Sequence, residues 1–92
     1  KAAAKASIQS IKWLGFNCRI EVESEADELF ADLRTKLADA SSSLVKAKPI
    51  KNGKASLMVL DDSNEAELAT VAIYDKYGNI LARKATTVGG ED

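Results

Sequence analysis

The chain has 92 residues, 46% hydrophobic and 29% charged, which is typical of one globular domain. Thirteen Lys and Arg residues against fourteen Asp and Glu residues give a net charge of −1, which excludes an overall preference for polyanions or membrane surfaces. The chain has no histidine and one cysteine, Cys18, which excludes Ser–His catalysis, an internal disulfide and a Cys/His zinc site. Because the sequence begins at Lys1 without a methionine, we expect a processed product or a domain of a longer protein.

The first predicted element is a helix over residues 3–14. Its apolar residues recur at helical spacing: Ala4, Ile8, Ile11 and Leu14. Gly15 follows at the position of a helix C-terminal cap. From residue 16 the pattern changes to strict alternation of apolar and polar residues, which predicts a half-buried strand over residues 16–23 with Cys18 on its inner face.

Residues 24–41 are predicted to form a long amphipathic helix. Ser24 occupies the N-cap position, and acidic residues follow in the first turn, where the helix dipole favours them. The apolar residues recur on one helical face: Ala26, Leu29, Phe30, Leu33, Leu37 and Ala40. Asp32 and Lys36 are spaced as an i,i+4 ion pair on the outer face.

The rest of the chain is predicted to be a meander of four antiparallel strands at residues 44–50, 54–60, 68–75 and 79–87. The dipeptide Asn52-Gly53 favours a two-residue type I′ turn between the first two strands. Such a turn places Lys51 directly opposite Lys54. In the last turn, at residues 76–79, Gly78 or Asn79 can take the left-handed conformation.

These elements predict an α+β fold: an N-terminal helix, then a strand, a long helix and a four-stranded antiparallel meander, with the long helix packed on a curled antiparallel sheet. We expect a basic amphipathic N-terminal helix at residues 1–15, an α+β core domain at 16–88 and a flexible tail at 89–92. From residue 16 onward the order of elements resembles the topology of the cystatins. The turn at residues 51–54 lacks the Gln-x-Val-x-Gly hairpin by which cystatins engage cysteine proteases.

Charged residues are segregated along the sequence. Residues 1–20 contain four basic residues and no acid, residues 21–39 contain seven acids and two bases, and residues 46–54 contain four lysines and no acid. Separated charges of this kind steer the orientation of a partner and suit head-to-tail association. The alternative is that the blocks face one another within one molecule or are simply solvated.

Five residues are predicted to bind a partner: Trp13, Lys46, Lys48, Lys51 and Lys54. The four lysines are suited to contact phosphates or an acidic protein surface, although lysines on hairpins also protect edge strands from aggregation. No aromatic residue lies among them, whereas single-stranded nucleic acid is usually bound by stacked aromatic side chains. Trp13 is either an interface anchor or a cap over the end of the core.

Other chemistry has little support in the sequence. Residues 61–67 space oxygen atoms like half of a calcium loop, but Ala66 and Ala72 replace its glycine and its terminal glutamate. We therefore expect a solvated acidic turn, no metal and no cofactor. No nucleophile–base pair and no glycine-rich phosphate loop is present, so the chain is not expected to be an enzyme.

The predicted function is that of a non-enzymatic protein-interaction or assembly module, which self-associates or docks a protein partner through its segregated charged faces. No membrane is expected among its partners. Two alternatives stay open. One is a nucleic-acid-binding accessory protein that uses the lysine-rich hairpin, and the other is a protein inhibitor of cystatin-like topology.

Overall fold

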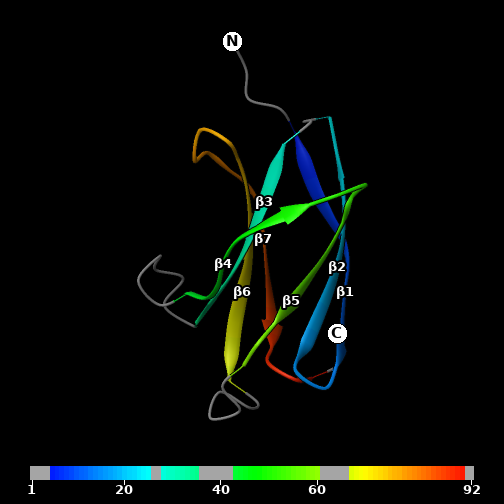
Figure 1. The fold of residues 1–92 in the computed structure, drawn as a ribbon, viewed down its shortest axis with the longest axis vertical. Helices are drawn as coiled ribbons and strands as arrows, with labels where there is room; N and C mark the ends of the chain where they lie inside the picture. The colour runs from blue at the N-terminus through cyan, green and yellow to red at the C-terminus, as the bar shows by residue number, and fades with distance from the viewer. Residues whose placement is uncertain (1–4, 26–27, 36–42, 61–66, 91–92) are drawn as a thin grey trace.

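The computed structural model describes residues 5–25, 28–35, 43–60 and 67–90. Its seven strands are β1 (Ala6–Leu14), β2 (Asn17–Ser24), β3 (Leu29–Thr35), β4 (Ser43–Ile50), β5 (Lys54–Met58), β6 (Leu68–Asp75) and β7 (Ile80–Thr87). They form two antiparallel sheets, one of three strands in the order β1-β2-β5 and one of four strands in the order β4-β3-β6-β7 (Figure 1). Since the described residues are all-β, the predicted α+β fold is wrong.

The two sheets pack against each other around one apolar core. The three-stranded sheet and its flanks contribute Ile11, Cys18, Ile20, Val22, Leu57 and Val59 to it. The four-stranded sheet and its flanks contribute Leu29, Ala31, Leu33, Ala69, Val71, Ile73 and Val88. Each sheet thus covers the apolar face of the other, which is the arrangement of a β-sandwich. Cys18 is fully buried, as its inner position predicts.

The expected N-terminal helix is strand β1, which pairs with β2. A β-bulge between Ile8 and Ser10 shifts the register of this pair by one residue. The bulge widens the spacing of two core-facing residues, Ile8 and Ile11, from two residues to three. A bulged strand therefore imitates helical spacing. Gly15, expected as a helix cap, has a φ of +64° and begins the tight turn into β2, where a glycine is favoured.

The expected helix at 24–41 is also wrong where the structure describes it. Residues 29–35 form β3, which lies between β4 and β6 and is therefore a central strand. Leu29, Ala31 and Leu33 alternate into the core, and Phe30 faces the other way, where it stacks on Tyr74. Helix propensity is a weak preference that tertiary pairing overrides, as it does here. The expected partners Ala26, Leu37 and Ala40 lie outside the described residues.

The predicted strands in the second half are confirmed, but their arrangement as one meander is wrong. β6 has the predicted bounds, and β4, β5 and β7 begin or end within two residues of theirs. However, β4 pairs with β3 in one sheet, and β5 pairs with β2 in the other. Without the long helix and the meander, the resemblance to cystatin topology is also lost.

Candidate binding groove

A groove of about 550 Å³ opens on the surface where β4 and β5 diverge. Figure 1 shows the two strands leaving their common turn in different directions. The groove is lined by Arg19, Ile20 and Glu21 of β2, by Lys48 and Pro49 of β4, by Lys51, and by Lys54, Ala55 and Ser56 of β5. It therefore combines residues that are far apart in the sequence.

The turn between β4 and β5 closes one end of this groove. Lys51 and Lys54 form an antiparallel bridge in which each backbone N–H donates to the other's carbonyl at 3.0 Å. Asn52 and Gly53 both have positive φ, at 54° and 73°, which is the predicted type I′ geometry. The Val22 N–H donates to the Gly53 carbonyl at 2.7 Å, and a Cβ on Gly53 would lie 2.6 Å from the Val22 carbonyl oxygen. The contact with β2 therefore requires glycine.

Pro49 explains why the two strands separate beyond this bridge. The backbone N–H and carbonyl groups of successive strand residues point to alternate sides. The backbone groups of residue 49 therefore point toward β5, as those of Lys51 do. The next hydrogen-bonded pair of the hairpin would join residues 49 and 56, but proline has no N–H to donate. β4 instead pairs with β3, with Pro49 opposite Phe30. The divergence of the strands creates the groove.

The outer face of the three-stranded sheet supplies one wall. Arg19 and Glu21 of β2 are exposed and stand opposite Ser56 and Lys54 of β5, respectively. The wall thus carries two cationic side chains, one carboxylate and one hydroxyl. Lys48 and Lys51 add two cationic side chains from the other side. All of these charges are exposed to solvent, so their interactions are screened by salt.

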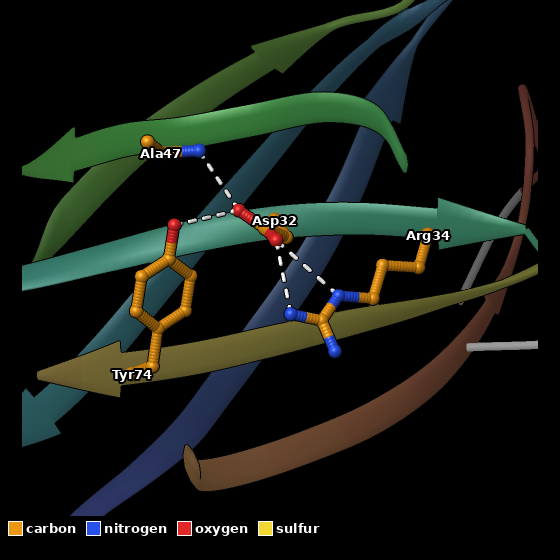
Figure 2. Close-up of polar contacts among 4 residues, drawn as sticks. All are labelled: Asp32, Arg34, Ala47 and Tyr74. Carbon is orange, nitrogen blue, oxygen red and sulfur yellow. Dashed lines mark hydrogen bonds and ion pairs between the residues drawn. The ribbon is translucent and has the colours of Figure 1, made fainter. Parts of the chain in front are cut away.

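A buried carboxylate fixes the strand that carries Lys48 and Pro49. Asp32 of β3 is 4% exposed, and its Oδ1 accepts hydrogen bonds from the Ala47 N–H at 2.8 Å and the Tyr74 hydroxyl at 2.9 Å (Figure 2). Its Oδ2 accepts from Arg34 Nε at 3.2 Å and Nη2 at 3.0 Å. The register of β3 and β4 shifts beside Asp32, between Ala31 and Leu33. Asp32 therefore pairs with Arg34, and it holds the irregular part of β4 next to the groove.

Asp32 stays ionised because its partners compensate for its burial. Burial raises the pKa of Asp32, but the hydrogen bonds from Ala47, Tyr74 and Arg34 and the charge of Arg34 outweigh it and hold the pKa below its ordinary value of 3.8. Burial and the hydrogen bond to Asp32 raise the pKa of Tyr74 above 10.0. At neutral pH this cluster is a carboxylate held by a neutral phenol, a backbone amide and a guanidinium.

The structure brings three of the five predicted residues together. Lys48, Lys51 and Lys54 line the groove, while Lys46 is exposed on β4 outside its lining. Trp13 lies on β1, at the opposite edge of the three-stranded sheet from β5. Its indole packs against the core, and its Nε1–H donates to Thr86 Oγ1 at 2.8 Å, which joins β1 to β7. Neither Trp13 nor Lys46 belongs to this groove, and the structure does not test the prediction that they contact a partner.

Sequence reasoning did not find the other three polar residues of the groove, which are Arg19, Glu21 and Ser56. The alternation of residues 16–23 places Arg19 and Glu21 on an exposed face, but it does not show which strand pairs with it. Their approach to Ser56 and Lys54 depends on the β2–β5 pairing, which joins residues 37 and 33 positions apart. No local pattern in the sequence reports such a contact.

Most of the acidic segment 61–67 lies outside the described residues, so the structure has no bearing on it. Among the residues that are described, no three Cys, Asp or Glu side chains gather closely enough to hold a metal ion. The described part of the chain also contains no helix of the length and apolarity that spanning a membrane requires. Comparison of the chain with protein-family models, curated proteins and solved structures finds no significant match.

Proposed function

We propose that this domain is a non-enzymatic protein-interaction module that binds an acidic protein partner in the groove between β4 and β5. The observation that supports this proposal is the convergence of Arg19, Lys48, Lys51 and Lys54 around one concavity. Four cationic side chains with one carboxylate create a positive potential, and a groove concentrates that potential more than a flat surface does. Complementary charge of this kind speeds association and orients the partner.

The groove lining favours a protein partner over a nucleic acid. Glu21 lies among the cations, where it repels the nearest anions of either ligand, but a polypeptide offers N–H groups and side-chain donors that can hydrogen-bond to it and a phosphate backbone does not. The lining includes no aromatic side chain on which bases would stack. Pro49 and Ala55 supply apolar surface for the carbon atoms of a polypeptide.

Titration of the ¹⁵N-labelled domain with poly-L-glutamate, followed by NMR at low and high salt, tests this proposal. We expect the amide signals of residues 19–21, 48 and 51–56 to shift, and the shifts to shrink at high salt because exposed charges are screened. The double variant Lys48→Ala/Lys51→Ala should weaken binding at least tenfold. Lys46→Ala is the matched control, since Lys46 lies on the same strand outside the groove, and it should bind like the original chain.

Two results of this titration contradict the proposal. Poly-L-glutamate that leaves the groove amides unchanged shows that the groove does not bind acidic polypeptide. Equal weakening by Lys48→Ala/Lys51→Ala and by an equally charged double variant outside the groove, Lys12→Ala/Lys46→Ala, shows that net charge alone attracts the polymer.

A further inference from the structure

We infer that the acidic partner binds as an extended segment, which pairs with the free edge of β5 at Ser56 and so adds a strand to the three-stranded sheet. This inference rests on the proposed function, because it specifies the form in which an acidic partner enters the groove. Strand addition to an exposed edge is a common mode of peptide recognition, in which backbone hydrogen bonds supply affinity and side chains supply specificity.

The hydrogen bonds at both ends of β5 show which backbone groups face the groove. The Val59 N–H donates to the Phe16 carbonyl at 2.9 Å, on the side of β2, and the Lys54 N–H donates to the Lys51 carbonyl, on the side of β4. Because these directions alternate along a strand, the N–H and carbonyl of Ser56 point the same way as those of Lys54, away from β2. They face the space between β5 and β4.

No strand of the described residues occupies that space. β5 is the last strand of its sheet, with β2 as its one strand partner there. Pro49, which a continuous hairpin would place opposite Ser56, has no N–H to donate, and β4 pairs with β3. Ser56 is exposed and lines the groove. An incoming peptide therefore meets one backbone donor and one backbone acceptor at this point of β5.

The charges around Ser56 match an acidic peptide in extended conformation. Side chains of a strand alternate between its two faces, so every second side chain of an added strand projects on the outer face. Arg19 and Lys54 lie on that face, next to Ser56, and Lys48 and Lys51 lie across the groove. Carboxylates at alternate positions meet these cations, while Glu21 accepts from a hydroxyl or amide of the peptide. A phosphate backbone has no N–H donor for the Ser56 carbonyl to accept from.

The decisive probes are three blocked, fluorescein-labelled hexapeptides of alternating Glu and Val. One is unmodified, one is N-methylated on two Glu residues, and one is N-methylated on two Val residues. N-methylation removes backbone donors from one edge of an extended peptide and leaves its charge unchanged. By fluorescence anisotropy with the wild-type domain, we expect one methylated isomer to bind like the unmodified peptide and the other to bind at least tenfold more weakly.

Two variants test the β5 edge itself. Ser56→Pro removes the N–H that faces the groove, at an edge where proline is tolerated because β2 does not use that donor. It should weaken binding of the unmodified peptide at least tenfold, whereas Ser56→Ala keeps the N–H and should bind normally. Because Ser56→Pro also constrains the backbone, the thermal unfolding of this variant is measured as well. The methylated peptides test strand addition independently, since they are used with the wild-type domain.

The outcomes separate this inference from the proposed function. Equal affinity for the two methylated isomers overturns strand addition but leaves acidic protein binding in place. The same holds if none of the hexapeptides binds while poly-L-glutamate still shifts the groove amides. If neither the hexapeptides nor poly-L-glutamate binds, both proposals are overturned.

Discussion

The amide nitrogen of Ala47 lies 2.8 Å from Oδ1 of Asp32, and Ala47 adopts a φ of +52°. This left-handed conformation is rare for residues other than glycine and asparagine. It occurs at the irregularity where β4 departs from regular pairing with β3. The hydrogen bond to the buried carboxylate therefore holds a strained backbone immediately before Lys48, at the wall of the groove.

Replacing Ala47 with glycine should stabilise the fold. The left-handed conformation costs an L-residue about 1–2 kcal/mol, and the greater entropy of unfolded glycine, about 0.5–1 kcal/mol, offsets part of the gain. We expect Ala47→Gly to raise the free energy of unfolding by up to about 1.5 kcal/mol in urea denaturation. The control Ala85→Gly, in the exposed part of β7 without positive φ, should lower it by about 0.5–1 kcal/mol. Equal losses in both variants would show that Ala47 is not strained.

Removing the carboxylate of Asp32 should strongly destabilise the fold. Asp32→Ala removes the acceptor of the Ala47 N–H and of the Tyr74 hydroxyl, and it removes the carboxylate that pairs with the largely buried Arg34. Breaking a buried ion pair on one side costs about 3–5 kcal/mol, more than removing both charges. Chemical denaturation should therefore show a smaller loss for Asp32→Ala/Arg34→Leu than for Asp32→Ala. A loss below about 1 kcal/mol for Asp32→Ala would contradict the role of this cluster.

The raised pKa of Tyr74 predicts a loss of stability at high pH. Above pH 10.0 the unfolded chain releases the phenol proton while the folded chain retains it, so the free energy of unfolding falls as pH rises through the folded pKa. Tyr74→Phe removes this titration and also removes the hydrogen bond to Asp32, so it should be less stable at neutral pH and decline less between pH 9 and 11. If the free energy of unfolding fell equally with pH in the wild-type domain and in Tyr74→Phe, the loss of stability would not come from Tyr74. The lowered pKa of Asp32 has the opposite consequence, a loss of stability as pH falls below 3.8.

Reversing one charge of the turn should separate stability from binding. Lys51 and Lys54 stand directly opposite each other, and like charges in this position are mildly destabilising. Lys51→Glu creates a pair of opposite charges, so we expect thermal unfolding at a slightly higher temperature and at least tenfold weaker binding of an acidic peptide. Lys46→Glu makes the same change in net charge outside the groove and should affect binding less. If Lys51→Glu and Lys46→Glu lost affinity for the acidic peptide equally, binding would depend on net charge and not on the groove.

Parts of this fold can be predicted from the sequence because their signals are local. Alternation gives β2, Asn52-Gly53 gives the type I′ turn, and Gly78 takes the left-handed conformation with a φ of +87° in the last turn. The helix predictions were wrong for different physical reasons. In β1 a bulge changes the spacing of core residues. In β3, helix-forming residues such as Leu33 are held between β4 and β6, and β6 lies far away in the sequence.

One signal in the sequence argues against the predicted meander. Pro49 lies where a continuous hairpin needs a backbone donor, and proline within a strand is typical of an edge. The lysines of the groove were also predictable as exposed charges close in sequence. The position of these lysines next to Arg19, Glu21 and Ser56 could not be predicted, because it depends on the pairing of β2 with β5 in the three-stranded sheet.

A comparison of the affinities for two ligands tests most directly the central claim that the groove binds acidic protein. A labelled oligo-L-glutamate peptide and a labelled oligothymidylate of equal charge are titrated with the wild-type domain and with Lys51→Glu at the same salt concentration. We predict that the peptide binds more tightly than the oligonucleotide and that Lys51→Glu removes this preference. Tighter binding of the oligonucleotide, or a peptide affinity that Lys51→Glu does not change, would contradict the proposed function.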